Sequence, residues 1–395
     1  MARHSHTVLA VALAGLVLIA PTHAGQYLLT DLGALSGGAS YAYGINSLGQ
    51  VVGYSSTTTP AYADHAFLYS GGVMTDLGTL GGTMGKGSRA YGINDSGQVV
   101  GMSAYMAPPS LPEHPMPYQI FRAFLYSGGA MTDLGTLGGT NSCAFGINNA
   151  GQVTGMAQIS VYGQETQVGF IYSNGTMSGI TDPDSFGRAI NNSGQATGTF
   201  NPVCTAEDHW WHPHDIYGNP EPAATDHAFL YSGGAVGNLG SPCGVVSHGM
   251  AINDLGLVAG YTQTSWEGWS VEQACLFPGD GTVSILGHLG GGASFAYGID
   301  DTGQVVGYSL TASAQNHAFL YSGGVMTDLN DLIDPGSGWT LVEARALNDS
   351  GQIVGYMSHP NSQAHAYLLT PVPEPATLSL VALGGLGLIR RRRAG

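Results

Sequence analysis

Two short phrases recur along this chain, and this repetition constrains its fold more than any other feature. The first, "HAFLYSGGVMTDLG", begins at His65 and returns with changes at Arg122, His227, His317 and, shortened, at His365. Two worn copies, "VGFIYS" and "QACLFP", bring its count to seven. The second, of the type "GINDSGQVVG", also occurs seven times, at intervals of 43 to 62 residues. A unit repeated at such intervals must be a supersecondary block whose apolar face is covered by its neighbours.

Each unit contains four short apolar segments, typified by "RAYGIN", "QVVGYS", "HAFLYS" and "VMTDLG". Glycine or Asn/Asp residues separate the segments, and these residues accept the backbone conformations of hairpin turns. Glycine accounts for 62 of the 395 residues and only 9% are charged, which favours a turn-rich β protein. The repeat therefore predicts an all-β fold, a seven-bladed β-propeller of four-stranded antiparallel blades.

The ends of the repeat region carry complementary fragments. "QYLLTDLG", from Gln26, matches only a fourth strand, and "HAYLLT", from His365, matches only a third. We expect the N-terminal strand to complete the last blade, because an open array would leave both fragments as exposed edges. From the axis outward, the predicted order is "AYGIN", "QVVGYS", "HAFLYS", "MTDLG", with small Ala and Gly suited to the crowded centre.

Alternate connections of an antiparallel blade lie on opposite rims of the ring. The two tight turns of each unit fall on one rim, called here the hairpin rim. The two connections that vary between copies fall on the other, called the variable rim.

The N-terminal segment, residues 1–24, is typical of a signal peptide. Arg3 precedes an apolar run, and small residues precede a cleavage position after Ala24. The alternative, an N-terminal membrane anchor, is disfavoured because the run is shorter than the roughly 20 residues that span a bilayer. We therefore expect an exported chain whose propeller occupies residues 25–370.

The C-terminal segment, residues 371–395, joins Pro373, Glu374 and Pro375 to an apolar run and four arginines. The arginines would hold this segment at the cytoplasmic face of the membrane, giving the chain a transient membrane association. The segment resembles the PEP-CTERM sorting signal of Gram-negative bacteria. This resemblance implies processing by an exosortase-type protease near the Pro-Glu-Pro motif and an extracellular or cell-surface location. A plain tail anchor is the alternative.

The charge balance excludes one class of partner. Five of the ten Lys and Arg residues lie at the two ends, which leaves five in the body of the chain against 26 acidic residues. Such an acidic surface repels phosphate backbones, so we expect no nucleic-acid partner. Neutral glycans and cations remain possible.

The phrases "HAFLYSGG", "TDLGTLGG" and "GINDSGQVVG" resemble those of the HAF extracellular repeat family. The resemblance covers the chain from Gln26 to Thr370. It implies an exported protein built of repeats, and it supplies no catalytic residues.

The longest insertion, "NPVCTAEDHWWHPHDIYGNPEPAATD", lies on the variable rim of blade four. Its histidines could hold a metal ion, its paired indoles could stack on sugar rings, or the indoles could cover the blade and leave the histidines in water. The candidate ligand-binding residues are Trp210, Trp211, His209, His212, His214 and Asp215. A proline-rich insertion, "AYMAPPSLPEHPMPYQIF", and a third containing Trp266 and Trp269 lie on the same rim.

Repeated histidines and acidic turns have structural interpretations. The histidines of the "HAF" phrase lie in different blades, too far apart to share one metal ion. Turns such as Asn94-Asp95 and Asp300-Asp301 are predicted to be Asx turns rather than calcium loops.

Three of the four cysteines have a predicted role. Cys275 replaces the phenylalanine of the phrase and is predicted to be a buried thiol. Cys204 and Cys243 are the pair for which we expect a disulfide, which export permits.

The chain has no nucleophile elbow, phosphate-binding loop or consensus metalloenzyme motif, so we expect neither enzymatic activity nor a cofactor. The predicted function is a binding or scaffold protein of the cell envelope or extracellular matrix, with exopolysaccharide as its ligand. The alternatives are a purely structural envelope component and a propeller-type hydrolase or lyase.

Overall fold

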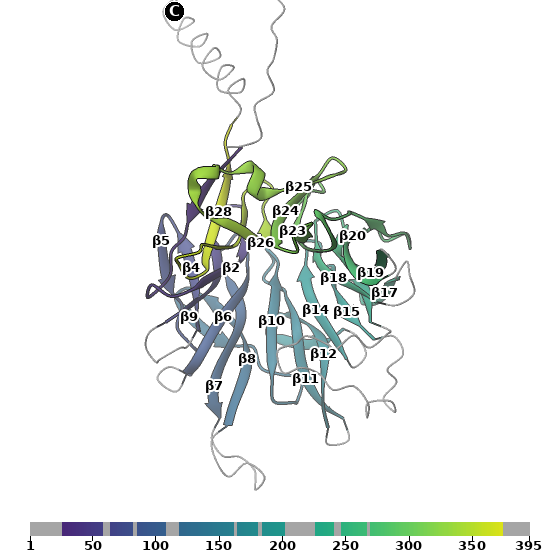
Figure 1. The fold of residues 1–395 in the computed structure, drawn as a ribbon. Helices are drawn as coiled ribbons and strands as arrows, with labels where there is room; N and C mark the ends of the chain where they lie inside the picture. The colour runs from purple at the N-terminus through teal and green to yellow at the C-terminus, as the bar shows by residue number, and fades with distance from the viewer. Residues whose placement is uncertain are drawn as a thin grey trace, which may run out of the picture.

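The computed structural model is a closed ring of seven four-stranded antiparallel sheets, which confirms the predicted fold (Figure 1). The colour of the chain in Figure 1 runs around the ring once, and the first and last strands meet in the same blade. The structure describes residues 26–57, 64–81, 85–107, 118–161, 164–180, 184–201, 226–240, 246–266 and 269–373.

In each blade the strands are named here from the axis outward. Blade one comprises β2 (Ser40–Ile45), β3 (Val51–Ser56), β4 (Asp64–Ser70) and β5 (Val73–Asp76). Blade two comprises β6 (Gly85–Ile93), β7 (Val99–Ala107), β8 (Tyr118–Ser127) and β9 (Ala130–Asp133). Blade three comprises β10 (Ser142–Ile147), β11 (Val153–Val161), β12 (Gln164–Ser173) and β13 (Thr176–Gly179). Blade four comprises β14 (Ser185–Ile190), β15 (Ala196–Phe200), β16 (His227–Ser232) and β17 (Ala235–Gly240).

The remaining blades follow the same order. Blade five comprises β18 (Ser247–Ile252), β19 (Val258–Trp266), β20 (Trp269–Phe277) and β21 (Ser284–Ile285). Blade six comprises β22 (Gly290–Ile299), β23 (Val305–Thr311), β24 (Asn316–Ser322) and β25 (Val325–Asp328). Blade seven comprises β26 (Thr340–Leu347), β27 (Ile353–Ser358), β28 (His365–Pro371) and β1 (Tyr27–Asp31). Two short 3₁₀ helices, η2 (Leu329–Leu332) and η3 (Pro335–Ser337), connect blades six and seven.

The N-terminal strand closes the ring, as the sequence fragments predict. β1 pairs with β28 along its whole length, with Leu29 opposite Leu369. Backbone hydrogen bonds extend the pairing beyond both ends: Leu32 N donates to Ala366 O at 3.0 Å, and Val372 N to Gln26 O at 2.8 Å. Blade seven is thus a complete four-stranded sheet.

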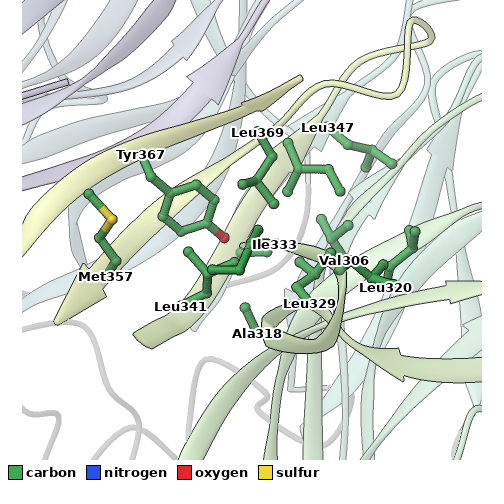
Figure 2. Packing of buried hydrophobic residues seen from close by; sticks show 13 residues of the cluster. Val306, Ala318, Leu320, Leu329, Ile333, Leu341, Leu347, Met357, Tyr367 and Leu369 are labelled. Atoms are coloured by element: carbon green, nitrogen blue, oxygen red, sulfur yellow. The ribbon is translucent and has the colours of Figure 1, made fainter. Parts of the chain in front are cut away.

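The hydrophobic core lies between the blades. Each of six buried clusters in the described part of the chain joins residues of two neighbouring blades. The largest of the six fills the space between blades six and seven, where Leu329 and Ile333 from the connection pack against Tyr367 and Leu369 of β28 (Figure 2). Adjacent blades therefore stabilise each other, and a blade on its own would expose its apolar faces.

The structure gives each residue of the "HAF" phrase a role. His65 Nδ1 lies 2.8 Å from the Asp76 carboxylate on the next strand of its blade, and His317 pairs with Asp328 in the same way. The alanine and phenylalanine that follow, Ala66 and Phe67, are fully buried. The repeated phrase is therefore a cross-strand polar pair followed by two core positions.

Hydrogen bonds between turns join the blades on the hairpin rim. Asn46 Oδ1 accepts from the backbone N–H of Leu48 and Gln50, which confirms an Asx turn. Its Nδ2 donates to the carbonyl of Asn94 in the next blade at 3.1 Å. Equivalent bonds form six of the seven possible links around the ring. At the seventh, Asp300 has a carboxylate in place of the donating amide.

A β-bulge in every innermost strand explains a glycine that all seven copies share. In β2 the pairing with β3 shifts between Ala42 and Gly44, and the bulge brings the Tyr41 carbonyl against Gly53. A Cβ built on Gly53 would lie 1.9 Å from that oxygen, and the equivalent glycines give 1.8 to 2.0 Å. Only glycine therefore fits this position.

Replacing Gly53 with alanine is expected to destabilise the protein by about 3 kcal/mol, at the upper end of the usual cost of overpacking, because the obstructing atom belongs to the backbone. Gly237→Ala is the matched control, since the nearest atom to its Cβ would be 3.7 Å away. Chemical denaturation of both variants measures the difference. If the Gly53→Ala and Gly237→Ala variants were equally stable, β2 would have moved away from the new methyl group without loss of stability.

Candidate functional site

The blade-four insertion lies outside the described residues. His209, Trp210, Trp211, His212, His214 and Asp215 belong to it, and so does Cys204. Cys243, Ala24, Glu374 and Pro375 also lie outside, whereas Pro373 is the last residue described. The ligand contacts, the disulfide and the cleavage positions at these residues stay predictions.

The "HAF" histidines do not converge. His365 Nδ1 lies 2.9 Å from the Asp31 carboxylate within blade seven, as His65 and His317 lie beside aspartates of their own blades. Among the described residues, no group of three or more His, Cys, Asp or Glu side chains is placed to hold a metal ion.

Cys275 is fully buried in β20, opposite Gly260, at the phenylalanine position of the phrase. This confirms the predicted buried thiol. Burial also raises the pKa of the Cys143 thiol in β10 to about 12. Both groups therefore remain protonated near neutral pH, and neither has the character of a reactive thiolate.

A connected set of aromatic and basic side chains lies on the innermost strands. The residue within each bulge is skipped by the strand pairing, and bulges re-aim side chains in this way. These seven residues, called here the axial ring, are Tyr43, Tyr91, Phe145, Arg188, Met250, Tyr297 and Arg345. All seven are half-buried. Because they come from the innermost strands of a closed ring, the solvent that reaches them lies along its axis.

Neighbouring members of the axial ring contact one another. The rings of Tyr43 and Tyr91 meet edge to face with centroids 5.4 Å apart, and Tyr91 lies equally close to Phe145. The guanidinium of Arg188 lies over Phe145 at 4.7 Å. On the other side of Tyr43, Arg345 lies between Tyr43 and Tyr297, at 4.9 and 4.2 Å. A continuous series of contacts thus extends over six blades, in which each of the two guanidinium groups lies over an aromatic ring of a neighbouring blade.

A buried carboxylate completes the assembly. Glu343 is 5% exposed and its oxygens lie 2.9 and 3.0 Å from Arg345 Nη2. It also accepts hydrogen bonds from Tyr356 and Tyr297. Burial raises the pKa of Glu343, and the Arg345 cation only partly opposes this shift. The pair is therefore held in a tyrosine-lined site with little access to water.

Arg188 has no such partner in the described part of the chain. No carboxylate there lies within ion-pair distance of its guanidinium, and its Nε is buried without a hydrogen bond. Nearby, His248 is bonded to Thr199 at 3.0 Å and stacks on Tyr261. Burial, reinforced by the Arg188 cation, lowers the pKa of His248 to about 3. His248 is therefore neutral at physiological pH, and the Arg188 guanidinium is a cation without an ion-pair partner among the described residues.

One sequence feature points to the axial ring, although the repeat pattern does not draw attention to it: the positions of the few basic residues. Of the five basic residues in the body of the chain, four lie on innermost strands, and two of these, Arg188 and Arg345, belong to the axial ring. The expectation that small residues occupy the crowded centre needs refinement. Ala42 is buried between blades, and Gly44 approaches the neighbouring strand closely, whereas large side chains occupy the axis. In β2 this difference follows the alternation of the strand, in which Ala42 and Gly44 are buried and Tyr43 is partly exposed.

A concavity of about 440 Å³ lies on the outer edge of blade seven. Tyr27, Leu28 and Leu29 of β1 form one wall, and Asp334, Ser337 and Trp339 form the other. Trp339 packs against His359 and His365, each with ring centroids 5.2 Å away. Its lining is mainly apolar, and Val372 borders it where the described chain ends.

Comparison with known proteins identifies the C-terminal signal. Residues 371–393 match the PEP-CTERM protein-sorting motif. The chain carries a surface-sorting signal. The protein is therefore exported and sorted to the cell surface, with processing by an exosortase. No curated protein matches the chain. In the described residues, no helix is long and apolar enough to span a membrane.

Several solved structures are similar in fold. An acylaminoacyl peptidase from Pyrococcus horikoshii aligns over 86% of this chain and 53% of its own, with 9% identity and a TM-score of 0.48. The chain thus spans about half of that peptidase. A gluconolactonase from Xanthomonas campestris aligns over 89% and 92%, with 9% identity and a TM-score of 0.37. The propeller domain of a Pyrococcus furiosus protease aligns over 74% and 98%, with 12% identity and a TM-score of 0.34.

Proposed function

We propose that this chain is a binding protein of the bacterial cell surface or extracellular matrix whose ligand is an extracellular polysaccharide. The proposal includes membership of the HAF-repeat proteins and a Gram-negative host. The sorting motif supplies the location, and the strongly acidic chain disfavours nucleic acid.

The axial ring is the observation that carries the proposal. Sugar rings present apolar faces that stack on aromatic side chains, and hydroxyl groups that accept hydrogen bonds from arginine. Tyr43, Tyr91 and Phe145 offer adjacent aromatic surfaces, and the Arg188 guanidinium, which makes no ion pair with a described carboxylate, lies beside them. These side chains are held by strands rather than by loops, so little conformational entropy is lost when a ligand binds.

Replacing Arg188 with methionine is expected to weaken glycan binding by tenfold or more, because charge-assisted hydrogen bonds would be lost while the packing volume remains. Arg122→Met is the matched control. It removes the same charge from β8, where arginine takes the place of the "HAF" histidine. Binding would be measured by titration with a glycan selected on an array. Equal affinities of both variants would exclude the axial ring as the site.

The blade-four insertion supplies a second test. We expect replacement of Trp210 and Trp211 with alanine to weaken binding about 30-fold if the ligand extends from the axis onto the variable rim. The melting temperature should be unchanged, since the insertion lies between β15 and β16, outside the blade sheet. Loss of binding in this double variant but not in Arg188→Met would place the site at the insertion. Unfolding would show that the indoles belong to the core.

One observation favours a hydrolase or lyase as the second candidate. Glu343 is a carboxyl group with a raised pKa, which is what a general acid requires. Release of reducing ends from the bound polysaccharide would support this alternative, provided that Glu343→Gln abolishes it. Binding without turnover favours the binding protein.

A further inference from the structure

The exposed apolar side chains of the described residues are concentrated on the hairpin rim. Leu48 and Leu255 lie in turns between first and second strands and are 70% and 78% exposed. All but one of the others lie at or near the turns between third and fourth strands or beside the chain ends: Leu28, Val73, Val236, Val325 and Val372. The exception, Ile285, lies opposite Cys275 at the far end of its strand. Clusters of exposed apolar residues on one face mark an interaction surface.

Both ends of the described chain leave from this rim. β28 runs toward the hairpin rim and ends at Pro371, and β1 begins there at Tyr27. Leu28, 62% exposed, and Val372, 49% exposed, lie side by side at this point and border the concavity of blade seven.

The length of the tail limits how far this rim can stand from a membrane. The apolar run of the sorting motif begins at Ala376, only four residues after Val372. Even fully extended, that connection spans roughly 14 Å. The run, from Ala376 to Ile389, is also shorter than the roughly 20 residues that cross a hydrocarbon core. Such a mismatch draws flanking residues toward the bilayer.

We propose that the hairpin rim beside blade seven docks on the lipid surface that holds the uncleaved tail, with the variable rim facing away from it. This inference rests on the sorting route in the proposed function. Leu28, Val372 and the neighbouring exposed valines contact the interfacial region of the bilayer. The docked ring holds Pro373 at the membrane surface, where a membrane protease can reach it, and keeps the variable rim free.

The charges on this rim determine which lipids suit it. Asp95, Asp254, Asp301 and Asp349 lie exposed in the turns near the axis. Burial, with the charges of Asp349 and Asp254 nearby, raises the pKa of Asp301. Such a rim is repelled by anionic lipids and tolerated by zwitterionic ones.

The test places an environment-sensitive NBD fluorophore on either rim of the full chain, tail included, in phosphatidylcholine vesicles. Leu28→Cys reports on the hairpin rim, and Ser313→Cys, exposed between β23 and β24, reports on the variable rim. We expect a blue shift and strong quenching by nitroxide-labelled lipid for the probe at 28, and neither effect at 313. Labelled wild-type chain corrects for the native cysteines, of which Cys143 and Cys275 are buried.

Equal signals at both positions, or a signal at 313 alone, would overturn the proposal. Val372→Cys provides an independent reporter should the first variant fold poorly. Adding phosphatidylglycerol should weaken the signal at 28, and a stronger signal would contradict the position of the acidic turns. Glycan affinity of the labelled proteins is measured in parallel, so failure of membrane docking and failure of the proposed function are distinguished.

Discussion

Deleting Gln26 to Gly33 from the mature chain is expected to lower the free energy of unfolding by at least about 4 kcal/mol. The deletion removes β1, and with it Tyr27 and Leu29 from one core cluster and Leu32 from another. Burial of such side chains contributes about 1.5 to 3 kcal/mol each. The deletion also leaves the backbone groups of β28 unpaired along an exposed edge.

The chain from Gln26 to Pro373 is the reference for this experiment, and thermal and denaturant unfolding measure the loss. A synthetic peptide covering residues 26–33 should restore stability in a concentration-dependent way, because it binds only the folded ring. A deletion variant as stable as the reference would show that the ring does not depend on closure by β1.

Replacing Arg345 with methionine is expected to destabilise the protein by about 3 kcal/mol at pH 7.5. The substitution leaves the Glu343 carboxylate buried without its cation, and breaking a buried ion pair from one side is strongly unfavourable. The variant Glu343→Gln/Arg345→Met should recover much of the loss, because no buried charge remains. A double variant that is no more stable than Arg345→Met would show that packing against Tyr43 and Tyr297 matters more than charge.

The pH dependence of this loss follows from the direction of the pKa shift. Burial raises the pKa of Glu343 above its ordinary value of 4.5, so between the unfolded and folded pKa values the folded state binds more protons than the unfolded state. Stability therefore falls as pH rises through this window. Without Arg345 the pKa rises further and the window extends upward. The variant should lie closest to wild type near pH 4.5 and diverge as pH rises, which unfolding at several pH values would measure.

The two rims of the ring have different roles in this interpretation. The hairpin rim carries the chain ends, the linked Asx turns and the exposed apolar residues, and it faces the membrane during sorting. The variable rim carries the insertions, and it faces outward toward possible ligands. In the proposed arrangement, the rim that contacts the membrane and the rim that recognises a ligand are thus opposite faces of one ring.

The sequence by itself determined the architecture because the information is local and repeated. Turn residues mark four strands per unit, seven copies mark seven blades, and the fragments at Gln26 and His365 specify how the ring closes. The buried thiol of Cys275 also followed from the repeat, since its position in the phrase is that of Phe67.

Only the tertiary structure shows which residues form the axial ring and which of them contact one another. Tyr41 and Tyr43 share a face of β2, as alternation predicts, but the bulge between Ala42 and Gly44 leaves Tyr43 without a pairing partner on β3, which the sequence pattern does not show. Arg188 and Arg345 are 157 residues apart in sequence, and they line the same axis because the ring closes. Glu343 and Arg345 lie two residues apart on β26, whereas Tyr43 and Tyr297 belong to the two neighbouring blades. The tyrosines therefore flank Arg345 only once the blades are assembled.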